Sequence, residues 1–125
     1  MQRLKTRPQF QAVLADRLTA KTEHFALHRH EIDPISPSPL PVNGTWIGAM
    51  VPKRWAKRAV TRNAIKRQIY TVSASLKEHF PQAAFLVRLR RSFPRETFVS
   101  ATSTDLKEAV RSELQALMQA GLAPN

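Results

Sequence analysis

The segment that most restricts the fold of this chain is residues 57–79, which has the spacing of a long amphipathic helix. At about 100° per residue, four apolar side chains fall within about 60° of one another, and they are Ile65, Ile69, Val72 and Leu76. A helix with one apolar stripe gains most of its stability by packing that stripe against other elements. Phe80 and Pro81 end the segment. We therefore expect a central helix that packs on a sheet or on other helices.

The polar side chains of this predicted helix differ between its two sides. Five residues beside the apolar stripe can donate hydrogen bonds or stack, and they are Arg62, Asn63, Lys66, Arg67 and Tyr70. We call this set the basic flank. The opposite shoulder is uncharged and consists of Val60, Thr61, Ala64, Gln68, Thr71 and Ser75.

The charge of the chain is concentrated around the same segment. The chain has 20 Lys and Arg against 9 Asp and Glu, which gives a net charge of +11 at pH 7. No acidic residue occurs between Asp33 and Glu78, whereas seven basic residues lie between Lys53 and Arg67. A surface that serves only solubility mixes both signs. This concentration favours a polyanionic partner, either nucleic acid or an anionic membrane.

Structured RNA is the partner that these residues fit best. Arg and Asn side chains donate to phosphates, sugars and base edges, and Tyr70 can stack on an unpaired base. A solvated basic face without a partner is the plain alternative, but repulsion at the i, i+4 pairs Arg58–Arg62 and Arg62–Lys66 costs roughly a few tenths of a kcal/mol each. A membrane is disfavoured because the apolar stripe is narrow and has no Trp or Phe anchor. A generic or ribosome-associated RNA-binding protein remains an alternative function.

The rest of the chain predicts one α+β domain over residues 1–125. We expect an α+β sandwich in which a small mixed sheet of about four strands packs with about three helices, in the order α-β-β-(β)-α-β-α. A first helix is expected from Thr6–Gln9 to residues 17–19, and strands are expected at 22–31, 45–51 and 83–90. An irregular stretch is expected at 92–100. A last helix should begin at Thr102 or Ser103, and its apolar stripe consists of Leu106, Val110, Leu114, Leu117 and Met118. A Pro-rich exposed loop is expected at 33–44 and a frayed tail at 120–125.

Several kinds of chemistry are excluded or disfavoured. The chain has no Cys, so disulfides, thiolate zinc sites and a cysteine nucleophile are excluded. The apolar runs are too short to span a bilayer and no secretory signal is visible, so we expect a cytoplasmic protein. His24, His28 and His30 alternate as on one strand face, but no acidic residue or Cys is expected beside them, so we predict no metal site. No catalytic motif or carboxylate pair is visible, so we expect no catalytic residues.

At Lys53-Arg54 and Ala59–Arg67 the sequence resembles the signature of the protein subunit of bacterial ribonuclease P. That signature has a lysine pair, Ala-Val, any residue, Arg-Asn-Arg, any residue and Lys-Arg, and this chain has Ala-Val-Thr-Arg-Asn-Ala-Ile-Lys-Arg. The resemblance covers about residues 4–118. The chain departs from the pattern at Ala64 and Tyr70, where basic residues are usual, and at 54–58, which lacks the usual Gly and carries Lys57 and Arg58.

The resemblance implies a protein that assists an RNA enzyme. In that family the RNA subunit is the catalyst and holds its own magnesium ions, and the complex removes the 5′ leader of precursor tRNA. The protein would bind ribonuclease P RNA and precursor tRNA, and neither a cofactor of its own nor a small-molecule substrate. By resemblance, the contacts to the catalytic RNA would be Lys53, Arg54, Lys57, Arg58, Arg62, Asn63 and Arg67.

The same resemblance implies a cleft for the single-stranded leader between the first helix, one sheet face and the central helix. Its residues would be Phe10, Leu14, His28, Lys66 and Tyr70. A positive groove with stacking or apolar side chains suits an extended single strand. Ordinary core packing is the competing interpretation for Phe10 and Leu14, and a plain surface position for His28. The resemblance also implies a left-handed crossover around the central helix, against the general rule.

Overall fold

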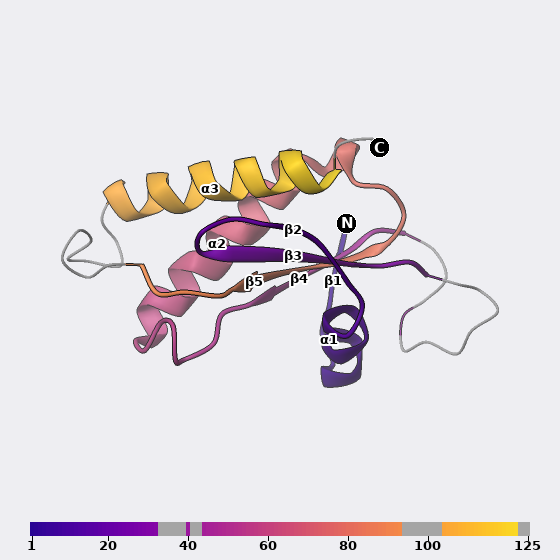
Figure 1. Cartoon of the computed structure of the whole chain (residues 1–125), viewed down its shortest axis with the longest axis horizontal. Coiled ribbons are helices and arrows are strands. Elements are labelled where there is room, and N and C mark those ends of the chain that lie inside the picture. Colours follow the sequence, from indigo (N-terminus) through magenta and orange to yellow (C-terminus); the bar gives the residue numbers. More distant parts are fainter. Residues whose placement is uncertain (33–39, 41–43, 94–103, 123–125) are drawn as a thin grey trace.

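The computed structural model describes residues 1–32, 40, 44–93 and 104–122. In this part of the chain, three α-helices and one 3-10 helix combine with a five-stranded mixed sheet (Figure 1). The elements are β1 (Gln2–Arg3), α1 (Arg7–Leu14), β2 (Arg17–Lys21), β3 (Phe25–His30), β4 (Trp46–Met50), α2 (Ala59–Ser75), η1 (Lys77–His79), β5 (Ala84–Leu89) and α3 (Thr104–Leu122). The predicted α+β class and the three helices are confirmed, whereas β1 and β2 were not predicted.

The strands lie in the order β1-β4-β5-β3-β2. β1 pairs with β4 and β4 with β5 in parallel, while β3 pairs antiparallel with both β5 and β2. β5 is the central strand, as its apolar run predicts, and all its side chains are buried except that of Arg88, which is half-buried. α2 connects the parallel neighbours β4 and β5, so the basic flank belongs to a strand-helix-strand crossover.

The two faces of the sheet are covered differently. α2 and α3 cover one face, and α1 lies against the other (Figure 1). The larger core, between the sheet and α2 and α3, contains three of the four stripe residues predicted for the central helix, Ile65, Ile69 and Val72, at 2 % exposure or less; Leu76 is half-buried beside them. It also contains the whole predicted stripe of α3. The smaller core under α1 consists of Leu4, Val13, Leu40, Trp46, Ala84 and Leu86.

The helix α1 begins where the sequence predicts and ends earlier. The Gln9 amide donates to Thr6 Oγ1 (3.4 Å) and the Thr6 amide donates to Gln9 Oε1 (3.1 Å), which completes the predicted capping box. The helix ends at Leu14 and not near residues 17–19. The Asp16 carboxylate accepts a hydrogen bond from the Arg17 amide (2.7 Å), and the chain continues directly into β2.

Strand β3 is shorter and more deeply buried than predicted. It begins at Phe25 and ends at His30, inside the expected range 22–31. A half-buried strand was expected, but Phe25, Ala26, Leu27 and His28 are all buried. The reason is that α1 covers the second face of the sheet, which the local alternation of the sequence does not reveal.

The predicted Pro-rich loop and the predicted tail lie only in part within the described residues, since residues 123–125 of the tail are outside them. Residues 33–39, 41–43 and 94–103 lie outside the described residues, but Leu40, inside the predicted exposed loop, is buried under α1. Gly44 has a φ of +97°, as the predicted turn requires. The predicted frayed tail is helical as far as Leu122, because Gly121 packs against the sheet. Among the described residues, no helix has the length and apolarity needed to cross a membrane.

Candidate nucleic-acid interface

The loop before α2 is held in place by an arginine of the helix itself. Arg62 Nη1 donates to the carbonyl oxygens of Ala56 (3.0 Å) and Lys57 (2.8 Å). The amides of Trp55 and Ala56 both donate to the Pro52 carbonyl oxygen at 3.1 Å. A charged donor makes stronger hydrogen bonds than a neutral one. Arg62, which was predicted as an RNA contact, therefore also fixes the shape of the loop.

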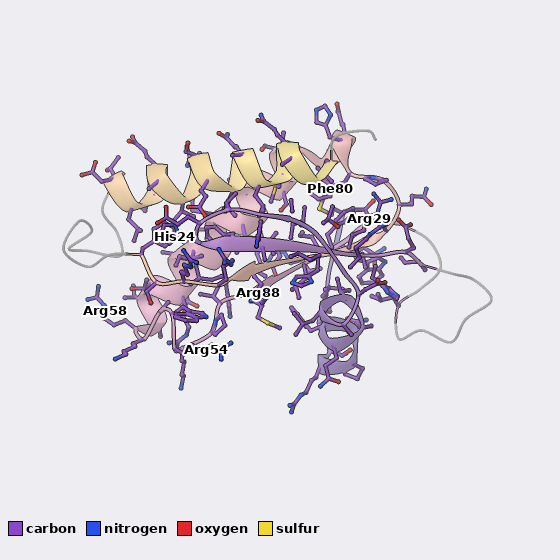
Figure 2. All side chains as sticks on the ribbon, viewed as in Figure 1. His24, Arg29, Arg54, Arg58, Phe80 and Arg88 are labelled. Atoms are coloured by element: carbon purple, nitrogen blue, oxygen red, sulfur yellow. The ribbon has the colours of Figure 1, made fainter. Side chains whose placement is uncertain are left out.

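The other predicted contacts to the catalytic RNA are exposed. Arg54 and Arg58 project outward at the end of the molecule where α2 begins (Figure 2). Lys53, Lys57, Asn63 and Arg67 are exposed as well, and so is Lys66, which was predicted as a leader contact. Within the described part of the chain, none of these cations forms an ion pair with an acidic side chain. The surface therefore offers uncompensated positive charge.

The start of α2 adds to this positive charge. Its first turn contains no acidic residue, and its N-cap, Arg58, makes no side-chain capping bond. The amide groups of the first turn carry the positive end of the helix dipole. Helix and side chains thus favour an anion at the same place.

Only part of the uncharged shoulder of α2 packs against α3, since Val60, Thr71 and Ser75 are exposed. Gln68 is 8 % exposed, and its Oε1 accepts a hydrogen bond from Arg111 Nε (3.4 Å). Thr61 and Ala64 are half-buried. One side of α2 is therefore packed against α3, while Asn63, Lys66 and Arg67 on the basic flank stay exposed.

Tyr70 lies beneath the guanidinium group of Arg3, a residue that was not predicted as part of the site. The guanidinium carbon of Arg3 is 4.0 Å from the centroid of the Tyr70 ring. Arg3 belongs to β1, so no local pattern in the sequence connects the two residues. Since Arg3 occupies one face of the ring, a base can stack only on the other face. Arg3 extends the basic flank to the edge of the sheet.

Two predicted leader contacts, Phe10 and Leu14, lie on the face covered by α1. Both are half-buried and pack against the smaller core, so the core-packing interpretation holds in part. A Cβ on Gly48 would lie 2.6 Å from Leu4 Cδ1 and 2.9 Å from Phe10 Cε1. Glycine at this position therefore lets Phe10 approach the sheet closely.

His28 lies on the same face, beside Arg88. It is 7 % exposed, so it is not the plain surface histidine of the alternative interpretation. Arg88 Nε donates to His28 Nε2 over 3.4 Å, from the side of the sheet on which α1 lies (Figure 2). Burial, and then the charge of Arg88, lowers the pKa of His28 below its ordinary value of 6.5. Arg88 was not predicted as a site residue, although a lone charged residue in the apolar run of β5 was a usable signal.

The five predicted leader residues therefore lie on two faces of the sheet. Lys66 and Tyr70 belong to α2, whereas Phe10, Leu14 and His28 lie on the α1 face. The two sets approach each other at the edge strand β1. There Arg3 covers Tyr70, and its neighbour Leu4 packs beside Phe10 on the opposite face.

The expected arrangement of the three alternating histidines is wrong for His24, whereas His28 and His30 share one face of β3. His24 precedes β3, and its Nδ1 lies 2.7 Å from Glu113 Oε1 on α3. His30 Nδ1 lies 2.8 Å from Asp16 Oδ2. His24 and His30 therefore each have an acidic neighbour, contrary to the expectation. His28 lies on the α1 face of the sheet, whereas His24 faces α3. In the described residues, no group of three or more His, Cys, Asp or Glu is placed to hold a metal ion.

Sequence comparison matches the chain to one family. The Ribonuclease P family model matches residues 1–118. The ribonuclease P protein component of Bordetella petrii is 33 % identical over 114 residues, covering 91 % of this chain and 86 % of that protein. The component from Paraburkholderia xenovorans is 28 % identical over 116 residues, covering 93 % of this chain and 77 % of that protein.

Solved structures share the fold. The RNase P protein of Staphylococcus aureus superposes with a TM-score of 0.70 at 19 % identity, covering 95 % of this chain and 94 % of that one. The RNase P protein of Thermotoga maritima superposes with a TM-score of 0.61 at 17 % identity, covering 93 % of this chain and 97 % of that one.

Proposed function

Because the chain belongs to the Ribonuclease P family, we propose that it is the protein component of a ribonuclease P and assists the complex in removing the 5′ leader of precursor tRNA. One observation carries the RNA-binding part of this proposal. The exposed cations of residues 53–67 gather at one end of α2 and, within the described residues, have no acidic ion-pair partner. Neutralising phosphates with such residues releases counterions, which drives binding to RNA.

The catalytic RNA would bind the loop before α2 and the basic flank. Lys53, Arg54, Lys57 and Arg58 would contact phosphates near the start of the helix, and Asn63 and Arg67 would continue the contact along it. Arg62 would act mainly through the loop that it holds. In this proposal the RNA subunit catalyses the cleavage and binds the magnesium ions.

The precursor leader would pass the edge strand β1. On one side of this edge the leader would contact Phe10, Leu14 and His28. On the other side it would contact Lys66 and the open face of the Tyr70 ring. Apolar and aromatic surfaces interleaved with cations suit a single strand without demanding one sequence. Arg3 and Arg88 would add positive charge, one on each side of the edge.

The test is cleavage of precursor tRNA by a bacterial ribonuclease P RNA at low magnesium, with and without the protein. We expect the protein to restore cleavage, and Arg67→Ala to weaken the effect by lowering affinity for the RNA. Arg17→Ala is the matched control, because Arg17 is an exposed arginine on β2 at the opposite edge of the sheet. Tight but indiscriminate RNA binding without restored cleavage would instead indicate a generic RNA-binding protein.

A second comparison tests the leader surface. Phe10→Ala should lower affinity for precursor tRNA and leave affinity for mature tRNA unchanged, because only the precursor carries a leader. An equal loss for both RNAs would refute the assignment of Phe10 to the leader.

A further inference from the structure

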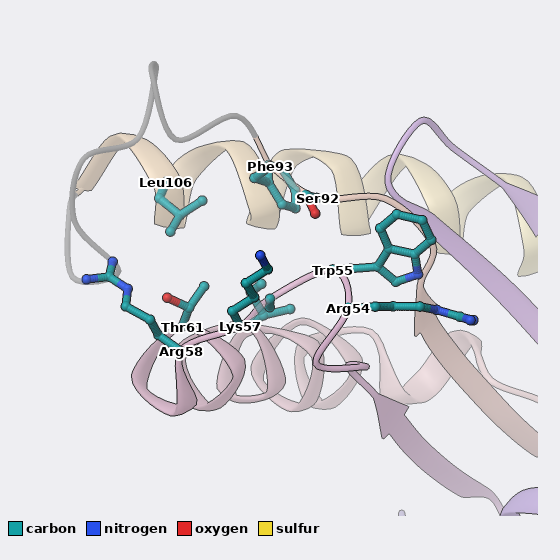
Figure 3. Close-up of a pocket in the computed structure, with 10 residues that line it drawn as sticks. Arg54, Trp55, Lys57, Arg58, Thr61, Ser92, Phe93 and Leu106 are labelled. Atoms are coloured by element: carbon teal, nitrogen blue, oxygen red, sulfur yellow. The ribbon is translucent and has the colours of Figure 1, made fainter.

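A cavity of about 180 Å³ opens beside the first turns of α2 (Figure 3). Its lining comes from the loop before α2, from α2 itself, from the segment after β5 and from the start of α3. The ten lining residues are Arg54, Trp55, Ala56, Lys57, Arg58, Thr61, Ile65, Ser92, Phe93 and Leu106. A cavity of about 150 Å³ can hold one benzene ring. This one therefore has room for a single aromatic ring system.

The lining combines aromatic rings with positive charge. Trp55 and Phe93 form part of the wall, and Ile65 and Leu106, both at 4 % exposure or less, form an apolar floor. Among the described residues that line the cavity, three are basic and none is acidic. Figure 3 shows Lys57 extending from the α2 side toward Phe93. Such a lining fits a flat, apolar-faced ring that is attached to an anion.

The Phe93 wall is fixed by contacts outside the cavity. The Phe93 ring stacks on His24 with centroids 4.0 Å apart and an interplanar angle of 13°. Glu113 holds that histidine through both its oxygens, since Oε1 lies 2.7 Å from His24 Nδ1 and Oε2 accepts a hydrogen bond from the His24 amide (2.7 Å). A wall positioned before binding lowers the entropic cost of binding.

The Trp55 wall is fixed as well. The Trp55 amide donates to the Pro52 carbonyl oxygen, and Arg62 holds the carbonyl oxygens of the next two residues. The guanidinium carbon of Arg54 is 5.4 Å from the Trp55 ring centroid. Contacts within the protein therefore hold both aromatic walls.

We propose that this cavity binds one unstacked base of the RNA that docks on the basic flank, with the base against the Trp55 and Phe93 rings and its phosphate near Lys57 and Arg58. This inference rests on the proposed function, because it takes ribonuclease P RNA as the source of the base. RNA-binding proteins read bases splayed from loops and bulges in this way. A base inserted here would fix the register of the RNA on α2, which phosphate contacts alone do not specify.

Tryptophan fluorescence tests the proposal directly. The chain has two tryptophans, and Trp46 is buried in the core at 6 % exposure, so the Trp55 signal is the difference between the wild type and Trp55→Phe. Titration with ribonuclease P RNA should quench the Trp55 signal, whereas titration with polyphosphate, which has charge but no bases, should not. Gel-shift measurements in the same buffer report binding independently.

The affinity of Trp55 variants for the RNA provides a second test of the proposal. Trp55→Ala should weaken binding to ribonuclease P RNA roughly 5- to 140-fold, the loss expected for one base–aromatic stack, while Trp55→Phe should keep most of the affinity. RNA that binds tightly without quenching Trp55 would overturn the base pocket and leave the proposed function intact. RNA that does not bind at all would overturn both. If Trp55→Ala fails to fold, the quenching measurement on the wild type and Trp55→Phe decides alone.

Discussion

The guanidinium of Arg3 lies 4.0 Å from the centre of the Tyr70 ring and so joins the first strand of the sheet to the central helix. The two residues are far apart in the sequence and belong to an edge strand and to α2. The contact places a cation and an aromatic ring on the path proposed for the leader, at the edge where the α1 and α2 faces meet.

The Arg3–Tyr70 pair should be measurable as a coupling energy. A double-mutant cycle over Arg3→Gln and Tyr70→Leu should give about 0.5–1 kcal/mol of coupling in the free energy of unfolding, the value of a partly exposed cation–π contact. Urea titration of the four proteins provides the measurement. Strictly additive effects would mean that the two side chains do not interact in solution.

Replacement of Arg62 should affect both stability and RNA binding, whereas replacement of Arg67 should affect RNA binding alone, although both are arginines of the basic flank. Arg62→Ala removes two charge-assisted hydrogen bonds to the loop, so it should lower the free energy of unfolding by about 1–3 kcal/mol and weaken RNA binding as well. Arg67 is exposed, and Arg67→Ala should leave stability unchanged while reducing the salt dependence of RNA binding by about one phosphate contact.

Thermal unfolding and salt-dependent affinity of the same two variants separate these effects. Arg17→Ala again provides the control for loss of one positive charge. If Arg62→Ala proves as stable as the wild type, the loop is not held by Arg62, and a loss of RNA affinity in that variant would then come from a direct contact to the RNA.

The end of α3 offers a test of the fold. A Cβ on Gly121 would lie 2.4 Å from Leu27 Cδ2, and Leu27 is fully buried. Gly121→Ala should therefore destabilise the protein by about 1–3 kcal/mol, although alanine favours helices more than glycine does. Ala120→Gly is the matched control at an exposed neighbouring position, with an expected loss of about 1 kcal/mol or less. A more stable Gly121→Ala variant would show that α3 does not pack against β3 at this point.

The sequence predicts well the features that depend on near neighbours. The start of α1 follows from Thr6 and Gln9, three residues apart, and the buried stripe of α2 follows from helical spacing. Strand β1 has only two residues and is specified by its pairing with β4, far along the chain, so no local pattern predicts it. Strand β2 has a bulge between Leu18 and Ala20, which interrupts the alternation that would have revealed it.

In the candidate site too, features that depend on near neighbours in the sequence were predictable, and features that depend on the fold were not. The exposed cations of the basic flank were predictable because charge and helical angle are properties of the sequence itself. The structural role of Arg62 was not, because it depends on where the carbonyl oxygens of Ala56 and Lys57 point. The cavity beside α2 was missed for a similar reason, since Trp55 and Phe93 come from segments that only the folded sheet brings together.

The buried histidine predicts how stability depends on pH. The pKa of His28 is lowered by burial and by Arg88, so the folded protein binds its proton less readily than the unfolded chain does. Below the ordinary value of 6.5 the unfolded state gains protons at this residue relative to the folded state, so the contribution of His28 to the free energy of unfolding falls as the pH decreases. One such group contributes a slope of at most about 1.4 kcal/mol per pH unit. Urea titrations between about pH 7.5 and about pH 5 measure this slope, because this pH range extends roughly one unit or more on either side of the ordinary pKa of histidine.

Replacement of the histidine isolates its contribution. His28→Gln should flatten the pH dependence over this range by removing that contribution, and the same replacement at the exposed His79 on η1 is the matched control. Asp16 does not interfere, because the hydrogen bond from His30, and then that from the Arg17 amide, lowers its pKa below 3.8. The stability that this carboxylate contributes is therefore lost only in more acidic solution. An unchanged slope in His28→Gln would mean that His28 is protonated as readily in the folded protein as in the unfolded chain, and hence that α1 and Arg88 do not enclose it.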